Sequence, residues 1–129
     1  MTVSFNHTIV AARDKHESAR FFTELFGMAD PTPFGPFLVV RLDHGASLDY
    51  ADTPDGEEIY PQHYAFLVSD DEFDAIYARI RTRGLQHWAD PRGKRPGQIN
   101  DRDGGRGVYF PDPAGHHLEI LTRPYGSGG

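Results

Sequence analysis

The chain repeats one pattern of residues, and this repeat constrains its fold more than any other feature. Residues 6–27 (NHTIVAARDKHESARFFTELFG) and 62–84 (QHYAFLVSDDEFDAIYARIRTRG) share the same order of features. Each has a polar residue, a histidine, a run of β-branched or aromatic residues, an amphipathic segment and a final glycine. A repeat of this length is typical of a supersecondary module that packs with a copy of itself. The sequence therefore predicts two similar modules within one domain, residues 1–129.

The amphipathic segments predict one helix in each module. Their apolar residues recur at helical spacing, which places them on one face. They are Phe21, Phe22, Leu25 and Phe26 in the first copy, and Phe73, Ile76, Tyr77 and Ile80 in the second. Each segment begins with the residue pair of a capping box and ends at a glycine, which favours a helix end. The pairs are Asp14 with Glu17 and Ser69 with Glu72, and the glycines are Gly27 and Gly84.

The similarity continues into the end of each module. VVRLDHGASLDY ends the first copy and YFPDPAGHHLEI ends the second, at an offset of about 70 positions, so Asp49 corresponds to Glu119. Alternating apolar residues in the later part of each module predict two or three strands after each helix. We place the modules at about residues 3–55 and 60–123, with a frayed tail at 124–129.

The second module carries an insert without a counterpart in the first. Residues 89–107 (ADPRGKRPGQINDRDGGRG) are rich in glycine, proline and charge, which is typical of a functional or mobile loop. The cations of the insert are Arg92, Lys94, Arg95, Arg102 and Arg106. They are candidates to clamp an anionic group of a substrate, although charges in a solvated loop are the alternative.

Three polar residues occupy repeat positions in the predicted strands. Side chains alternate along a strand, so His63 points away from Tyr64 and Phe66, which should pack on the helix. His7 holds the same position in the first module, and Glu119 should also leave the helix side. Two imidazoles and a carboxylate on one open face suit a divalent cation. Each residue alone has a structural alternative, but their recurrence favours a metal site.

Composition excludes several classes of function. The chain has no cysteine, so disulfides, thiolate ligands and cysteine nucleophiles are excluded. Its formal charge of −6 argues against a nucleic-acid partner. No apolar run approaches the roughly 20 residues that span a bilayer, and no secretory signal is visible. We therefore expect a cytoplasmic protein with a small-molecule substrate and no nucleic-acid or membrane partner.

The stretches NHTIV, QHYAFLV and VYFPDPAGHHLEI, in this order and separation, resemble the vicinal oxygen chelate superfamily over nearly the whole chain. This superfamily includes glyoxalase I, fosfomycin-resistance thiol transferases, extradiol dioxygenases and bleomycin-resistance proteins. The resemblance implies an α+β fold of two tandem βαβββ modules, a cupped mixed sheet with helices on its outer face, and a homodimer. It also implies that His7, His63 and Glu119 bind one divalent metal ion.

The ligands predicted for this ion are all nitrogen or oxygen, which suits Zn, Ni, Mn, Fe or Co. In this superfamily the metal chelates adjacent oxygens of the substrate and stabilises an oxyanion or enolate-like intermediate. Glyoxalase I carries a fourth ligand late in its first module. The matching residue is Asp49, which is a candidate ligand or base, with a solvent-facing strand residue as the alternative.

Individual members of the superfamily match less completely. Extradiol dioxygenases place a catalytic histidine shortly before the tyrosine that matches Tyr109, where this chain has the segment 100–102 (NDR). Fosfomycin thiol transferases have a threonine two residues after the first histidine, where this chain has Ile9, and a short potassium loop in place of the insert. Bleomycin-resistance proteins bind their drug without a metal.

We therefore expect a metal-dependent enzyme with lyase or isomerase chemistry, acting on a small oxygenated substrate for which the cations of the insert leave open an anionic group. Its candidate catalytic residues are Asp49 and Tyr109, the latter as a hydrogen-bond donor to a bound oxyanion, with a packing role in its strand as the alternative. A thiol transferase of the fosfomycin type is the alternative enzyme. A protein that sequesters a drug or metabolite is the alternative without catalysis.

Overall fold

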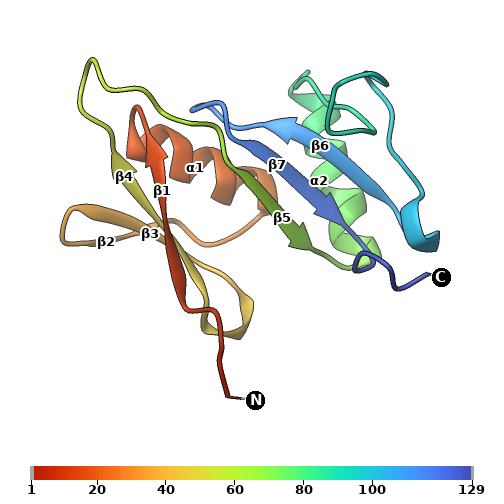
Figure 1. Ribbon diagram of the computed structural model, residues 1–129, viewed down its shortest axis with the longest axis horizontal. Coiled ribbons are helices and arrows are strands. Elements are labelled where there is room, and N and C mark those ends of the chain that lie inside the picture. The colour runs from red at the N-terminus through yellow and green to blue at the C-terminus, as the bar shows by residue number, and fades with distance from the viewer. Residues whose placement is uncertain (1, 129) are drawn as a thin grey trace. The chain divides into compact units, whose positions relative to one another are not determined.

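The computed structural model describes residues 2–128 and divides the chain into two compact units, Met1–Ile59 and Tyr60–Gly129. Each unit contains one copy of the sequence repeat and has its own helix and mixed sheet (Figure 1). The fold is therefore α+β with two tandem modules, as predicted. None of the helices in the described part of the chain is long and apolar enough to cross a membrane.

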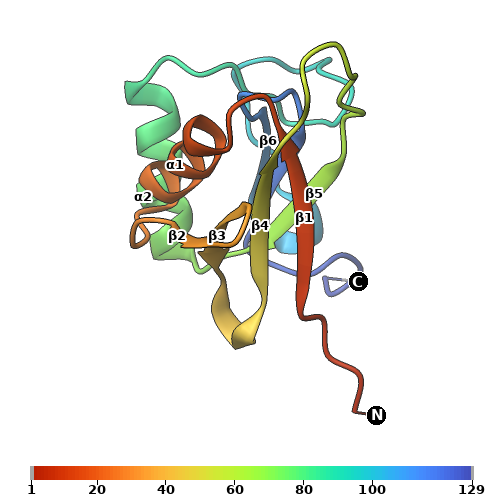
Figure 2. The ribbon, with the colours of Figure 1, turned by 90° about the vertical axis from the view of Figure 1, so that its left-hand side faces the viewer.

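The described part of the first unit has four strands, one α-helix and one short 3-10 helix. They are β1 (His7–Ala12), α1 (Lys15–Phe26), β2 (Thr32–Phe34), β3 (Phe37–Arg41), a short 3-10 helix η1 (Asp43–Gly45) and β4 (Ser47–Asp52). The strand order is β1-β4-β3-β2, in which β1 runs parallel to β4 and the other pairs are antiparallel. The helix α1 packs against β1, β3 and β4 on one face of this sheet (Figure 2).

The second unit repeats this plan with one strand fewer. Its elements are β5 (His63–Leu67), α2 (Asp70–Thr82), a short 3-10 helix η2 (Arg102–Gly104), β6 (Gly107–Pro111) and β7 (His117–Leu121). The order β5-β7-β6, with β5 parallel to β7, matches β1-β4-β3 of the first unit. Isolated bridges from Trp88 to Tyr109 and from Asn100 to Gly107 lie where a counterpart of β2 would be. The glycines and prolines of the insert do not sustain a longer ladder.

The helix ends agree with the sequence signals. Ser69 and Glu72 form the reciprocal capping box predicted for α2. The Asp14 carboxylate accepts hydrogen bonds from the backbone N–H groups of His16 and Glu17 at the start of α1. Gly27 ends α1 with φ of 68°, a left-handed conformation that glycine adopts without strain.

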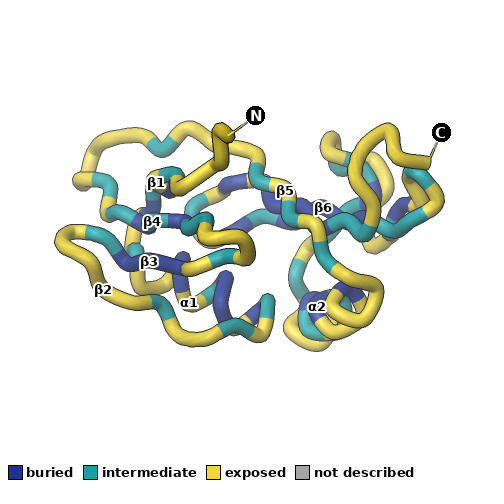
Figure 3. Tube along the Cα trace, turned by 90° about the horizontal axis from the view of Figure 1, so that it is seen from below, coloured by how far each residue is buried: buried dark blue, intermediate teal, exposed yellow. Residues whose placement is uncertain are grey.

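Each sheet buries one face under its helix (Figure 3). In the first unit the buried strand residues include Val10 and Ala12, whereas His7 and Ile9 are exposed on the alternate positions of β1. In the second unit every second residue of β5, beginning with His63, is exposed. Strand alternation thus directs both repeat histidines away from their helices, as the sequence predicts.

Candidate functional site

Strands β5 and β7 bring His63 and Glu119 together. Ala65 pairs with Glu119, so His63, two residues earlier in β5, lies on the same face as Glu119. The His63 Nε2 atom is 3.0 Å from Glu119 Oε1. The Glu119 side chain is only 1% exposed, while that of His63 is 46% exposed. A buried carboxylate therefore faces a ring nitrogen that solvent can still reach.

The two ring nitrogens of His63 have different partners. The Nδ1 atom lies 3.1 Å from the backbone carbonyl oxygen of His117, which can only accept a hydrogen bond. A neutral imidazole with hydrogen on Nδ1 presents its Nε2 lone pair to the Glu119 oxygen. Two such electron-rich atoms require a proton or a metal ion between them. Metal bonds of about 2.0–2.2 Å place neighbouring ligand atoms roughly 3 Å apart, so this pair fits an ion.

A chain of hydrogen bonds leads from Arg102 to the same carboxylate. Arg102 Nη1 donates to Tyr109 Oη at 2.8 Å, and the hydroxyl groups of Tyr109 and Tyr125 are 3.2 Å apart. Tyr125 Oη donates to Glu119, at 2.6 Å from both carboxylate oxygens. Because the Tyr125 hydrogen is directed to Glu119, the Tyr109 hydroxyl is the donor between the two phenols.

The electrostatics of this chain keep Tyr125 and Arg102 protonated. Burial of the hydroxyl raises the pKa of Tyr125 well above its usual value, and hydrogen bonds with Glu119 and Tyr109 raise it further. The hydrogen bond to Tyr109 raises the pKa of Arg102. Tyr125 and Arg102 are therefore donors over the whole physiological pH range.

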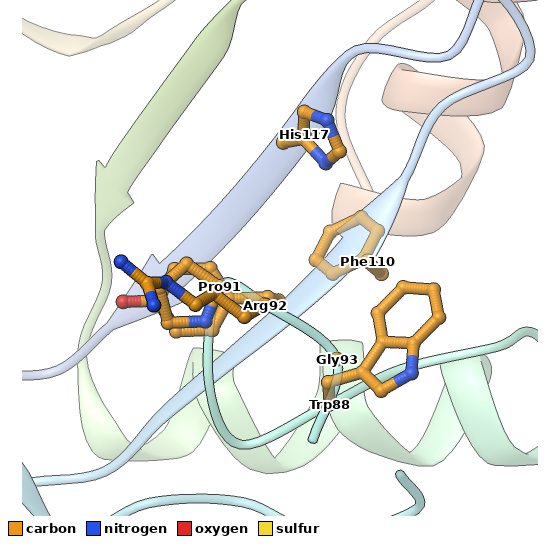
Figure 4. A pocket seen from close by; sticks show the side chains of 7 residues that line it. Trp88, Pro91, Arg92, Gly93, Phe110 and His117 are labelled. Carbon is orange, nitrogen blue, oxygen red and sulfur yellow. The ribbon is translucent and has the colours of Figure 1, made fainter. Parts of the chain in front are cut away.

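Two adjoining pockets lie in the second unit, and His63 lines the first of them. The first, about 590 Å³, is lined by His63, Tyr109 and Tyr125 together with Arg102 and Asp103 of η2. The second, about 180 Å³, shares Pro91 and Tyr109 with the first. Its remaining walls come from Trp88, which precedes the insert, and from the insert, β6 and β7 (Figure 4), through Arg92, Gly93, Phe110 and His117. A substrate bound at His63 could therefore extend into an aromatic pocket.

The first unit contains the equivalent pair in a different state. Ile9 pairs with Asp49, so His7 and Asp49 share a face in the same register as His63 and Glu119. The Asp49 carboxylate, half-buried, accepts a hydrogen bond of 2.8 Å from Ser47 Oγ, and His7 Nδ1 is 2.7 Å from Asn6 Oδ1. Within residues 2–128, neither unit by itself gathers three His, Asp or Glu side chains that could bind a metal ion. Of the predicted ligands, His63 and Glu119 are thus in contact, and His7 and Asp49 belong to the first unit.

The insert is fastened at several points, and its cations have different partners. Arg102 lies in the segment 100–102, where an extradiol dioxygenase would carry its histidine. Its guanidinium donates a hydrogen bond to the Tyr109 hydroxyl. Arg92 lines the aromatic pocket. Arg106 instead forms ion pairs of 2.6 Å with Asp74 and 3.1 Å with Asp70 of α2. Two of the predicted cations therefore lie at the pockets, while Arg106 has a structural role.

Tyr125 is the site residue that sequence reasoning missed. The segment 124–128, expected to be frayed, is tied to the insert because Asp103 accepts hydrogen bonds from the backbone N–H groups of Gly126 and Gly128. Gly129 lies outside the described residues. An aromatic residue in an otherwise polar, glycine-rich tail was the only signal, and its partner Glu119 has no periodic relation to it.

Comparison with known proteins decides the family. The model of the Glyoxalase/Bleomycin resistance protein/Dioxygenase superfamily matches residues 4–120. The chain belongs to this superfamily. The match covers both units and confirms the resemblance carried by the three sequence stretches.

The relatives are named for different reactions. The solved structure of oxidase ChaP-H2 has a TM-score of 0.95 and 60% identity, covering 100% of both chains. The glutathione transferase FosA of Serratia marcescens is 29% identical over 127 residues, or 93% of this chain and 81% of the relative. The metallothiol transferase FosB of Lysinibacillus sphaericus (strain C3-41) is 28% identical over 134 residues, or 95% of this chain and 84% of the relative. Membership of the superfamily is therefore compatible with more than one chemistry.

Proposed function

We propose that the protein is a metal-dependent oxidase that binds a small oxygenated substrate beside His63 and Glu119. The observation that carries this proposal is the 3.0 Å approach of His63 Nε2 to the buried Glu119 carboxylate, at the wall of a pocket. The reaction class is supported by 60% identity, over the full chain, to a protein named an oxidase. This likeness favours oxidation over the lyase or isomerase chemistry expected from sequence alone.

The ion would be bound by His63 Nε2 and the Glu119 carboxylate. His7 is the proposed third ligand, because it holds in β1 the position that His63 holds in β5. Asp49 is proposed as a fourth ligand or base, with its shorter side chain turned to Ser47 in this structure. When bound, the ion would act as a Lewis acid on adjacent oxygens of the substrate. A homodimer, which the resemblance implies, is part of the same proposal.

Residues of the second unit would orient the substrate. Arg102 polarises the Tyr109 hydroxyl, whose single hydrogen would turn from Tyr125 to an oxyanion of the substrate when substrate binds. The aromatic pocket beside Tyr109 would exclude water from the apolar part of the substrate. Arg92 at this pocket offers a guanidinium to an anionic substituent. The substrate class is thus a small molecule with vicinal oxygens, an apolar body and a negative charge.

Metal content per chain tests this proposal. Purified protein, stripped and then reconstituted with Fe²⁺ or Mn²⁺, should retain close to one ion per chain by elemental mass spectrometry. His63→Ala and Glu119→Gln should lose most of it, because each removes one atom of the pair, and His7→Ala should also lose it. His44→Ala is the matched control, since the side chain of His44 is 93% exposed. Wild-type protein that takes up no ion would rule out the metal-dependent function.

Oxygen uptake then tests the reaction class. Metal-loaded wild type incubated with catechols should consume oxygen, and His63→Ala should not. Uptake that is equal in both proteins would exclude catalysis at this pair.

A thiol transferase is a second candidate because FosA, at 29% identity, is named a glutathione transferase. This alternative predicts formation of a glutathione adduct of fosfomycin by the metal-loaded protein, detected by mass spectrometry. Adduct formation without oxygen uptake would replace the oxidase proposal with this one.

A further inference from the structure

We propose that the C-terminal segment 123–128 is part of the metal site and that Tyr125 is a positioning residue for the carboxylate of Glu119. This inference rests on the proposed function, since it assigns Glu119 to an ion. Tyr125 Oη lies 2.6 Å from both oxygens of Glu119, so the phenol contacts the carboxylate directly. Neither the family model, which ends at residue 120, nor the repeat includes this tyrosine.

The carboxylate can serve the phenol and an ion together. An ionised carboxylate accepts through two oxygens with about four lone-pair directions. In Glu119, Oε1 faces His63 Nε2, and the Tyr125 hydroxyl can direct its hydrogen to Oε2. A hydrogen bond to the oxygen that does not bind the metal fixes the direction of the one that does. Glu119 is 1% exposed, so the hydrogen bond from Tyr125 is made to a carboxylate that is out of contact with solvent.

The insert of the second unit anchors the tail that carries Tyr125. Asp103 in η2 has a left-handed φ of 57° and accepts from the Gly126 N–H at 3.0 Å and the Gly128 N–H at 3.3 Å. Arg102, the preceding residue, lies with its guanidinium carbon 5.5 Å from the centre of the Tyr125 ring. Figure 1 shows the C-terminal end beside the turn that precedes β6. Two neighbouring residues of η2 therefore hold both the backbone and the ring of this segment.

The direction of the hydrogen bonds supports a positioning role. Donation runs from Arg102 to Tyr109, then to Tyr125, and ends at Glu119. Each hydroxyl in this series accepts one hydrogen bond and donates one, so the geometry of the last donor depends on the others. In the first unit, Asp49 instead accepts a hydrogen bond from the Ser47 hydroxyl in its own strand.

The test is a titration with Co²⁺ alone, followed by visible absorption spectroscopy. Tyr125→Phe removes only the hydroxyl, and we expect it to weaken Co²⁺ binding about 10- to 100-fold, the range seen for supporting partners of metal ligands. The absorption bands of bound Co²⁺ should also shift, because the Glu119 carboxylate is no longer held in one orientation. Tyr60→Phe is the matched control, since Tyr60 is 74% exposed, and it should change neither quantity.

A second variant distinguishes the contribution of the tail backbone from that of the Tyr125 hydroxyl. Asp103→Ala keeps Tyr125 but removes the acceptor of the Gly126 and Gly128 N–H groups, so it should weaken Co²⁺ binding in the same direction by a smaller factor. Far-UV circular dichroism of all variants checks that the fold is retained. Should Tyr125→Phe not fold, Asp103→Ala carries the test by itself.

The outcomes are distinct. Unchanged affinity and spectrum in Tyr125→Phe and Asp103→Ala would overturn the positioning role while leaving the metal site in place. Tighter binding in Tyr125→Phe would also overturn it, because the phenol would then compete with the ion for Glu119. Wild type that does not bind Co²⁺, Fe²⁺ or Mn²⁺ would remove the metal site itself and this inference with it.

Discussion

At the residue scale, Asn100 connects the insert to the site. It is only 8% exposed, and its Nδ2 donates to the Ala89 carbonyl oxygen at 2.8 Å. Its Oδ1 accepts from the backbone N–H of Arg102 at 3.1 Å. A side chain at Gly107 would meet Asn100 at 2.9 Å, so the absence of a Cβ there makes room for the amide. One buried amide thus sets the start of the η2 turn, which carries Arg102 and Asp103.

Replacement of this amide should destabilise the protein. Asn100→Ala leaves the Ala89 carbonyl and the Arg102 N–H without their partner, and we expect the free energy of unfolding to fall by about 1–3 kcal/mol. Urea denaturation followed by circular dichroism measures this change. Asn6→Ala, at an exposed position, is the control. Equal stability of the two variants would contradict the anchoring role of Asn100.

At the element scale, the turn of residues 90–95 is organised by one carboxylate. The Asp90 side chain accepts from the backbone N–H groups of Lys94 at 2.9 Å and Arg95 at 2.7 Å. The bond from Lys94 is the main reason that the pKa of Asp90 lies below its ordinary value of 3.8. The turn also places Gly93 against the ring of Trp88, the only tryptophan in the chain.

Acid should therefore destabilise this turn. Because the pKa of Asp90 is lower in the folded than in the unfolded chain, its stabilisation is complete above 3.8 and is lost as the pH falls through the lowered value. Trp88 fluorescence should stay constant as the pH falls to 3.8 and change only at a lower pH, where Asp90 of the folded protein takes up its proton. Asp90→Asn should shift or abolish this transition, while Asp101→Asn in the same insert should not. A transition unaffected by Asp90→Asn would show that another group controls the turn.

At the scale of the whole molecule, the same order of a strand, a helix and further strands occurs twice, but the two sheets differ in their number of strands. The first unit completes a four-stranded sheet, whereas the second has three strands and uses the remaining length for the insert. Most of the described pocket walls come from this insert and from the strands next to it. The insert, which only the second copy of the repeat contains, thus explains why most of the candidate site lies in the second unit.

Metal binding should raise the stability of the whole protein if the ion binds only the folded state. At a free metal concentration of 100 times Kd, the expected gain is about 2.7 kcal/mol. Calorimetry with and without Mn²⁺ should show a higher Tm with the ion, reversed by a chelator. Glu119→Gln should show little change in Tm on addition of Mn²⁺. An equal rise in wild type and variant would indicate non-specific binding instead.

The sequence by itself determined the two modules, the ends of both helices and the strand face that carries His63 and Glu119. These features depend on local periodicity and on capping signals a few residues apart, which a single chain displays directly. The superfamily followed from the resemblance carried by NHTIV, QHYAFLV and VYFPDPAGHHLEI, and that resemblance also implied the α+β fold.

Only the tertiary structure decided that His63 and Glu119 are in contact, that Arg102 reaches Tyr109 and that the tail places Tyr125 on the carboxylate. The register of β5 on β7 joins residues 56 positions apart, and no local pattern specifies such a pairing. The insert and the tail have no periodicity at all, because glycine, proline and charged residues are compatible with many backbone paths. Their path is set by a few side-chain acceptors, the buried Glu119 among them, whose partners lie far from them in the sequence or have no periodic relation to them.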